Sequence, residues 1–383
     1  MITRRTFLGG LAAATAGVPL AANTVLAAGN PGSLATMSLT LRNESGSHAA
    51  DPVWAYVVGT NLATGQQCHL SADGRLVAVS EADNGPDGYT DYALPVESGG
   101  TTLSLPQGMS GRIYLAIGQK LKFRCNPGNA LAYPAGWVSA DPNYPILHDC
   151  AEFTYDAAGM HCNVTMVDML SVPLAISLSG ARQQTTGRLR DGGRAAVFSA
   201  LAAQPGFGGL VLENNLRVIA PGHGLNAGRF ATDYFAGYVD EVWNHYRSTT
   251  MTVTAGANAF TGQVQGEQFV FSGGVRPFSR PSTRDVLFCD GALAAPNDGV
   301  TGPVAAALGA GFNRTVLTNT GAQPVADAGT YYRREPTNHY SRVMHENTVD
   351  GKAYGFAFDD VCEHASYIED GAPTSMTVTI TPF

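Results

Sequence analysis

Charged side chains are scarce in this sequence. Only 14% of the 383 residues are Asp, Glu, Lys or Arg, and the formal net charge is −8, whereas an average globular protein carries about 25% charged residues. Binding to nucleic acid needs a basic face, and an anionic membrane attracts clusters of Lys and Arg. The composition therefore argues against nucleic acid or a membrane as a partner of the mature form. A surface rich in Thr, Ser, Asn and Gly suits a neutral polar partner instead.

Several motifs that carry cofactor or nucleophile chemistry are also missing. The chain has no CxxC or HExxH pattern, no phosphate-binding loop, no dinucleotide fingerprint and no GxSxG elbow. No zinc spacing is formed by the histidines and aspartates near the C-terminus, which are His339, His345, His364, Asp359 and Asp360. We therefore expect no cofactor and no metal requirement.

Long apolar stretches are absent apart from one at the N-terminus. Arg4 and Arg5 precede an Ala-rich apolar stretch from Leu8 to about Ala22, which is too short to span a bilayer comfortably. A paired arginine ahead of a modest apolar stretch is typical of a twin-arginine export signal. We predict that residues 1–27 are a cleaved signal peptide. The mature protein is then secreted or periplasmic, and we expect a soluble monomer.

Cysteines are few, but their number is informative. Six cysteines suit an oxidising compartment, in which disulfides form and persist. We therefore predict disulfides, although fifteen complete pairings are open. The residues concerned are Cys68, Cys125, Cys150, Cys162, Cys289 and Cys362.

The order of apolar and polar residues predicts a mostly β protein. Alternation or short β-branched runs indicate strands at residues 37–42, 53–58, 112–117 and 375–381. Turn residues separate these runs. A terminal strand needs a neighbour to pair with, and the first β region is the obvious one.

The pattern of apolar and polar residues changes between about residues 185 and 330, where it indicates a mixture of helices and strands. Residues 194–203 and 303–308 have helical patterns, and the clearest helix begins near Thr232. Its apolar stripe consists of Phe235, Tyr238, Val239, Val242, Trp243 and Tyr246. We predict one β domain made of residues 28–184 and 331–383. Residues 185–330 then form a mixed α/β domain that is inserted into it or packed beside it.

One hairpin combines two carboxylates with other polar residues. Asp156 to Gly159 is a turn signal between two alternating runs, so Glu152 should lie across from Val164 or Thr165. Asp168 would then lie about 10–14 Å further along the partner strand, before side chains lean together. This estimate permits the separation of about 6.5–9.5 Å that inverting glycosidases use. Two ordinary polar residues on a solvent face are the alternative.

The same segment resembles glycoside hydrolase family 64, the laminaripentaose-producing β-1,3-glucanases with a thaumatin-like β domain. The resemblance rests on strings that occur in order along nearly all of the mature chain. They are Glu152-Phe-Thr-Tyr155, Asn163-Val-Thr-Met-Val-Asp168, Ser171-Val-Pro-Leu174, Arg217-Val-Ile-Ala-Pro-Gly-His-Gly224, Tyr238-Val-Asp-Glu-Val-Trp243, Asp285-Val-Leu-Phe-Cys-Asp-Gly291, Asn338-His-Tyr340 and Asp350-Gly-Lys-Ala-Tyr-Gly-Phe-Ala-Phe-Asp-Asp-Val361.

The resemblance implies an endo-acting, inverting β-1,3-glucanase that releases short oligosaccharides, chiefly pentasaccharide. It implies a thaumatin-like β-barrel or sandwich domain, an inserted mixed α/β domain and a wide groove between them. Glu152 would be the general acid, kept neutral by Phe153 and Val164, and Asp168 the general base. The expected substrate-binding residues are Thr154, Asn163, Thr165 and Asp360. His161 departs from the family, whose members carry a sugar-stacking aromatic there.

Two other classes of protein remain open at this stage. A thaumatin-like glucan-binding or antifungal protein would bind β-1,3-glucan without cleaving it, and it would need neither carboxylate. A self-assembling structural exoprotein would show no glucan affinity. Among the tryptophans, Trp243 belongs to the apolar stripe, whereas Trp137, in a Pro/Gly-rich segment, is a candidate for the wall of a groove.

Overall fold

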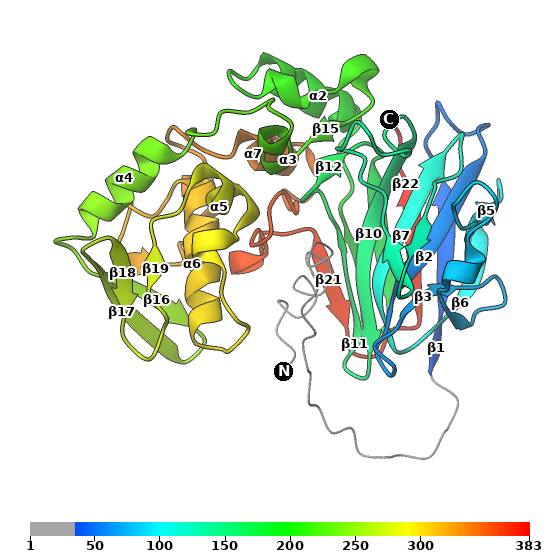
Figure 1. The fold of residues 1–383 in the computed structure, drawn as a ribbon, viewed down its shortest axis with the longest axis horizontal. Coiled ribbons are helices and arrows are strands. Elements are labelled where there is room, and N and C mark those ends of the chain that lie inside the picture. Colours follow the sequence, from blue (N-terminus) through cyan, green and yellow to red (C-terminus); the bar gives the residue numbers. More distant parts are fainter. Residues whose placement is uncertain (1–34) are drawn as a thin grey trace.

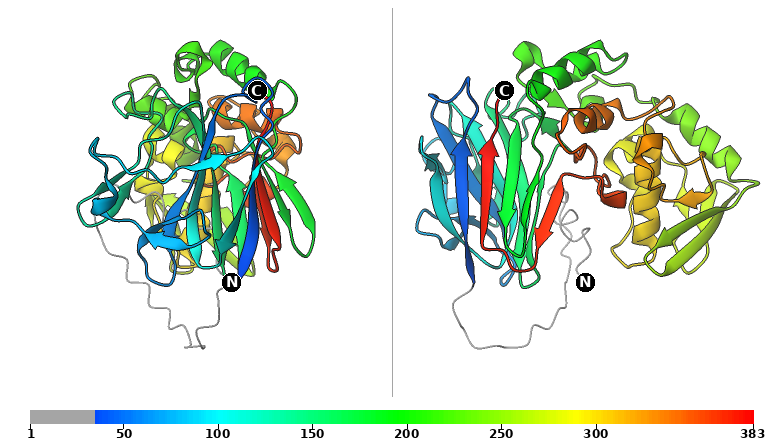
Figure 2. Two further views of the ribbon diagram at one scale, coloured as in Figure 1. Left: turned by 90° about the vertical axis from the view of Figure 1, so that its right-hand side faces the viewer. Right: turned by 180° about the vertical axis from the view of Figure 1, so that it is seen from behind.

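The computed structural model describes residues 35–383. The predicted signal peptide, residues 1–27, lies outside this range. Two large sheets occupy one side of the described chain, and most helices and a third sheet occupy the other (Figures 1 and 2). The mostly β fold predicted from the sequence is therefore confirmed.

The first sheet has five strands and joins the two ends of the described chain. Its order is β14-β13-β22-β1-β6, and β22 pairs in parallel with β1 and antiparallel with β13. The predicted pairing of the terminal strand with the first β region is thus confirmed. The strands are β1 (Thr36–Asn43), β6 (Thr101–Pro106), β13 (Leu174–Ser179), β14 (Gln183–Thr186) and β22 (Ser375–Ile380).

The second sheet has the order β21-β11-β10-β7-β2-β3-β4, and β5 also pairs with β2. Phe153 and Ile113 on one of its faces share a buried core with Leu39, Ile176 and Val378 of the first sheet. The strands are β2 (Val53–Asn61), β3 (Gln67–Leu70), β4 (Leu76–Ala78), β5 (Leu94–Val96), β7 (Met109–Ile117), β10 (Leu147–Asp156), β11 (Gly159–Val164) and β21 (Tyr367–Asp370). In the described residues these strands form two facing sheets and no closed barrel.

The mixed segment contains the helices and a smaller sheet of order β19-β18-β17-β16-β20. Its helices are α2 (Gly193–Ala203), α3 (Pro221–Asn226), α4 (Ala236–His245), α5 (Thr283–Phe288) and α6 (Thr301–Arg314), and α7 (His339–Asn347) follows. Its sheet consists of β16 (Met251–Ala255), β17 (Asn258–Gln265), β18 (Gln268–Phe271), β19 (Phe278–Ser279) and β20 (Ala322–Gln323). Two short pairs complete the fold, β8 (Arg124–Asn126) with β9 (Ala130–Ala132) and β12 (Met169–Leu170) with β15 (Val218–Ile219).

The predicted apolar stripe is the buried face of α4 and its flanks. All six of its residues are buried, and Trp243 packs against Phe269 and Phe312. The core role predicted for Trp243 is therefore confirmed. The helix begins at Ala236, four residues later than predicted, and Phe235 is its N-cap without a side-chain capping bond.

The prediction that the chain returns to β structure from Tyr331 is wrong for most of that segment. Helix α7 occupies His339–Asn347 and packs against α2, and the first strand after it is β21, which begins at Tyr367. Six residues of α7 are buried, among them Tyr340, Val343 and Met344. The helical spacing of these residues is the signal that the strand prediction missed.

The predicted disulfides are not formed in the described part of the chain. None of the six cysteines, all of which lie within residues 35–383, is disulfide-bonded, and five of them are buried while Cys362 is exposed. Cys150 and Cys125 belong to one apolar cluster and Cys162 to another, where each packs as a small apolar side chain. Burial of this kind accounts for the five buried cysteines without any cross-link.

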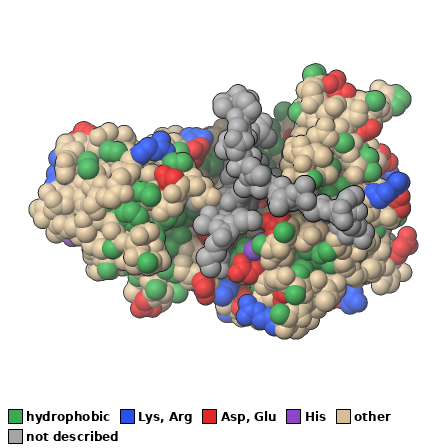
Figure 3. Space-filling model, turned by 90° about the horizontal axis from the view of Figure 1, so that it is seen from below, with side chains coloured by type: hydrophobic (Ala, Val, Ile, Leu, Met, Phe, Trp, Pro, Cys, Tyr) green, Lys and Arg blue, Asp and Glu red, His purple; other side chains and the backbone are tan. Residues whose placement is uncertain are grey.

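The surface matches the low charge content. On the face seen in Figure 3, charged side chains are scattered and most of the visible surface is uncharged. Among residues 35–383, no helix combines the length and the apolar character that crossing a bilayer demands.

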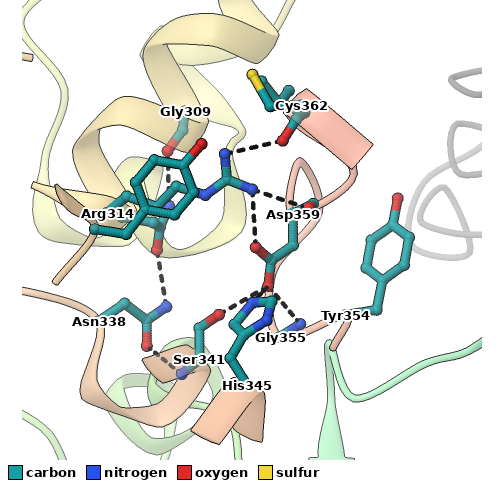
Figure 4. A network of polar contacts seen from close by, with 12 residues as sticks. Gly309, Arg314, Asn338, Ser341, His345, Tyr354, Gly355, Asp359 and Cys362 are labelled. Atoms are coloured by element: carbon teal, nitrogen blue, oxygen red, sulfur yellow. Dashed lines mark hydrogen bonds and ion pairs between the residues drawn. The ribbon is translucent and has the colours of Figure 1, made fainter. Parts of the chain in front are cut away.

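A buried polar network holds the segment before β21 against α6 and α7 (Figure 4). The Asp359 carboxylate accepts hydrogen bonds from Arg314 Nη2 at 3.1 Å, from Ser341 Oγ at 2.8 Å and from the backbone N–H of Gly355 at 3.0 Å, and His345 Nε2 lies 3.0 Å away. Arg314 and Asp359 are both inaccessible to solvent. Burial alone would raise the pKa of Asp359, but the neighbouring His345 and Arg314 hold it well below its ordinary value.

Asp359→Asn is expected to lower the free energy of unfolding by about 3–5 kcal/mol, because it leaves the Arg314 guanidinium buried without its counter-charge. Chemical denaturation measures this, with the exposed Asp350→Asn as a matched control. Since the pKa of Asp359 is depressed on folding, its contribution is present above pH about 4 and is lost as the pH falls below that value. The variant should therefore lose less stability in acid than the wild type. A loss below about 1 kcal/mol would contradict this role.

Candidate active site

Polar side chains line up across four strands on the face of the second sheet that is turned away from the shared core. The register pairs Arg112 with Glu152 and Glu152 with Asn163, in successive strands about 4.8 Å apart. Because side chains alternate along a strand, Phe153 points into the core while its neighbour Glu152 points to this face. Two parallel rows result, Arg112–Glu152–Asn163–Tyr367 and Ser110–Thr154–His161–Glu369.

Asp168 reaches the same face from the loop between β11 and β12. This loop is fixed at several points, since the N–H of Met166 donates to Tyr354 O at 2.8 Å and Tyr340 Oη donates to Met166 O at 2.6 Å. Past Asp168, the buried Asp149 carboxylate accepts the N–H of Ser171 at 2.8 Å. The loop therefore holds the Asp168 backbone in a defined place.

One guanidinium contacts both carboxylates. Arg112 Nη2 lies 2.9 Å from Glu152 Oε1 and 3.8 Å from Asp168 Oδ2. Because both distances run from the same nitrogen, these two oxygens cannot be farther apart than 2.9 plus 3.8 Å, which is about 6.7 Å. The facing oxygens of the two carboxylates are therefore closer together than the offset of about 10–14 Å that was predicted between the two backbones. The hairpin also closes one residue tighter than predicted, since Glu152 pairs with Asn163.

The surroundings of Glu152 correct a second expectation. Its side chain is only 3% exposed, but its neighbours are polar rather than apolar. Arg112 Nε donates to Glu152 Oε1 at 3.1 Å, and Asn163 Nδ2 donates to Oε2 at 3.3 Å. Phe153, which was expected to keep Glu152 neutral, belongs to the opposite face of the strand.

His223 contacts the other side of Asp168. Its Nε2 lies 2.8 Å from Asp168 Oδ1, and its ring stacks on Trp137 with centroids 4.2 Å apart. Pro221 at the first position of α3 and the bond from Ala220 N to Asp168 O fix the start of the helix that carries His223. Burial alone would raise the pKa of Asp168, but the His223 hydrogen bond and the Arg112 charge hold it below its ordinary value. Asp168 is therefore kept ionised.

A small pocket lies beside Asp168 and Arg112. Trp137, the candidate for a groove wall, is part of its lining. The lining residues are Arg112, Tyr114, Pro134, Trp137, Asp149, Cys150, Thr165, Asp168 and Met169. The pocket thus combines Asp168 with an aromatic wall and with Arg112.

Three of the four predicted substrate-binding residues lie beside the carboxylates. Thr154 lies two residues after Glu152 and shares a hydrogen bond of 2.7 Å with Ser110, Asn163 contacts Glu152 directly, and Thr165 lines the pocket with Asp168. Asp360 belongs to a different neighbourhood. It precedes the short helix η6 (Val361–Glu363), next to the Asp359 network.

His161 occupies the second row, where its ring bonds to neighbours on β21. His161 Nδ1 lies 2.7 Å from Tyr367 Oη and 3.2 Å from Glu369 Oε2. Polar contacts with β21 therefore hold the imidazole on the polar face of the second sheet.

Arg112 and His223 are site residues that the sequence reasoning did not select. A signal for Arg112 was present, because a charged residue inside a strand predicted to be buried is rare unless it is paired. His223 stood in the string Pro221-Gly-His-Gly224, which carried part of the resemblance but suggested no role.

Two carboxylates whose facing oxygens lie within about 6.7 Å of each other on the polar face of a sheet form an arrangement that glycoside hydrolases use. The profile of the Glyco_hydro_64 family, described as β-1,3-glucanase, matches residues 35–380. The chain therefore belongs to glycoside hydrolase family 64, as the resemblance in the sequence indicated.

Individual relatives agree with this membership. A glucan endo-1,3-β-glucosidase from Cellulosimicrobium cellulans is 37% identical over 296 residues, which are 74% of this chain and 54% of that protein. The chain thus spans about half the length of this curated relative. The crystal structure of a laminaripentaose-producing β-1,3-glucanase in complex with laminaritetraose superposes with a TM-score of 0.84 at 35% identity, covering 91% of this chain and 99% of that one. A β-1,3-glucanase domain from Clostridium beijerinckii gives a TM-score of 0.81 at 26% identity, covering 91% and 98%.

Proposed function

We propose that this chain is an endo-acting β-1,3-glucanase that cleaves linear β-1,3-glucan into short oligosaccharides, chiefly pentasaccharide. The observation that carries the proposal is the convergence of Glu152 and Asp168 on the Arg112 guanidinium, at 2.9 and 3.8 Å. Family membership supports it, as does the laminaripentaose production of the relative that superposes over 91% of the chain.

In the proposed reaction Glu152 is the general acid and Asp168 the general base. Glu152 protonates the glycosidic oxygen as the bond to the anomeric carbon breaks, and Asp168 takes a proton from the water that attacks that carbon from the opposite face. The upper limit of about 6.7 Å between the facing oxygens is compatible with the short end of the inverting range of about 6.5–9.5 Å. The low pKa of Asp168 suits a base that must be ionised.

The substrate proposed for this site is a neutral polysaccharide. Thr154, Asn163 and Thr165 offer hydroxyl and amide groups beside the acid and the base, which suits sugar hydroxyls. Asp360 is proposed as a more distant binding residue.

The wider setting of the site is also a proposal. We assign the two facing sheets to a thaumatin-like β domain, and the helices with the third sheet to a mixed α/β domain inserted into it, with a wide groove between them. The return to the β domain falls nearer Tyr367 than Tyr331, because α7 packs against α2. We propose export by the twin-arginine route and action as a secreted or periplasmic monomer, with no metal and no cofactor.

The anomeric form of the first product tests the mechanism. Proton NMR at early times, with a soluble linear β-1,3-glucan as substrate, is expected to show the α anomer before mutarotation. Early β product would exclude inversion while leaving the glucanase proposal in place. Tight glucan binding with no sugar released would favour the non-catalytic binding protein instead.

A further inference from the structure

The position of Arg112 is unusual for a charged residue in a β-sheet. It lies on β7, directly across from Glu152 on β10, and its side chain is only 15% exposed. Its Nη1 donates to Tyr114 Oη at 3.3 Å, its Nε donates to Glu152, and its Nη2 faces both carboxylates. The planar guanidinium thus presents separate N–H groups to three side chains at once.

We propose that Arg112 is a positioning residue for the catalytic pair, whose single guanidinium holds the two carboxylates at their working distance and places a positive charge beside the base, Asp168. This inference rests on the acid and base roles proposed for Glu152 and Asp168. It adds a third group, from a third segment of the chain, to the proposed reaction.

The reason lies in the charge balance of the pair. Two carboxylates whose facing oxygens are within about 6.7 Å repel each other, so one of them would tend to retain a proton. An opposite charge within about 4–6 Å reverses this tendency. Arg112 therefore keeps Asp168 ready to act as a base.

Among the other titratable groups around the pair, His223 also favours the ionised form of Asp168. Burial raises the pKa of Cys150, Tyr114 and Tyr133, so these groups are neutral while the carboxylates titrate. Burial raises the pKa of Asp149 to about 7, but the charge that acts on it is that of Arg217. His223 contacts the Oδ1 atom of Asp168, whereas the Nη2 atom of Arg112 faces both carboxylates.

The pH dependence of kcat/KM separates this role from a purely structural one. Activity requires an ionised Asp168, and the positive charge of Arg112 favours that form, so removing the charge raises the pKa of Asp168. Arg112→Gln is therefore expected to move the low-pH limb of the profile to higher pH by about one unit or more. Arg112→Lys places its charge at a single point, beside the nearer Glu152, so we expect the low-pH limb to move in the same direction.

The controls make each outcome decisive. Arg124→Gln removes an exposed arginine on β8 and should leave both limbs unchanged. An unshifted low-pH limb in a folded Arg112→Gln protein, whatever its rate of turnover, would overturn the proposal. If that variant does not fold, an unshifted low-pH limb in Arg112→Lys would overturn it equally. Absence of glucan hydrolysis by the wild type would instead contradict the proposed function.

Discussion

Glu152→Gln is expected to lower the rate of β-1,3-glucan hydrolysis by about 10²–10⁴-fold, the usual contribution of a general acid. The amide has nearly the same shape as the carboxyl group but cannot deliver a proton to the glycosidic oxygen. Its contacts can be kept in part, since Arg112 Nε can still donate to the amide oxygen. The measurement is the release of oligosaccharides from insoluble linear β-1,3-glucan, with the two proteins side by side.

The control for this prediction is Glu97→Gln, an exposed residue in the loop between β5 and β6, which should cleave glucan like the wild type. Thermal unfolding and a glucan pull-down show whether the Glu152 variant is folded and still binds. Wild-type product yield from Glu152→Gln would remove Glu152 from the reaction. Binding without product from wild type and variant alike would leave both carboxylates without a catalytic role.

Much of the β structure could be predicted because its signal is local. The alternation of Met37, Leu39 and Leu41 with polar residues requires no knowledge of the rest of the chain, and these three residues are buried in β1 as expected. The hairpin around Ala158 was also predicted, but the predicted register, with Glu152 opposite Val164 or Thr165, was wrong by at least one residue. The loop has only two residues, Ala157 and Ala158, and so brings Asn163 opposite Glu152.

The composition of the site was harder to predict because its members come from distant segments. Arg112 reaches Glu152 only because β7 and β10, forty residues apart, are neighbours in the second sheet. His223 comes from a helix fifty-five residues after Asp168. No local sequence pattern shows that Arg112 contacts Glu152 or that His223 contacts Asp168. The two carboxylates could therefore be chosen as candidates from the sequence, but the apolar surroundings expected for Glu152 were wrong.

Asp168→Asn is expected to reduce hydrolysis by a similar factor, about 10²–10⁴-fold, because no group remains to take the proton of the attacking water. The structure adds an expectation for the wild type. Because His223 and Arg112 offset the effect of burial and hold the pKa of Asp168 below its ordinary value, the base stays ionised as the pH falls to about 4. The low-pH limb of the kcat/KM profile, on which Asp168 gains its proton, should therefore have its midpoint below pH 4 when measured on soluble β-1,3-glucan.

His223 is the group most able to obscure this result, since it lies 2.8 Å from Asp168 and is itself able to accept protons. If His223 activated the water, Asp168→Asn would keep most of its activity and its acid limb would move up toward the pKa of a histidine. If Asp168 is the base, His223→Gln should retain turnover. The low-pH limb of its profile should shift upward toward the ordinary pKa of an aspartate, because Arg112 alone then remains to lower the pKa of Asp168. Asp233→Asn, which alters an exposed aspartate just before α4, should change neither rate nor limb. The two variants at the site thus distinguish the residue that takes the proton from the residue that keeps it ready.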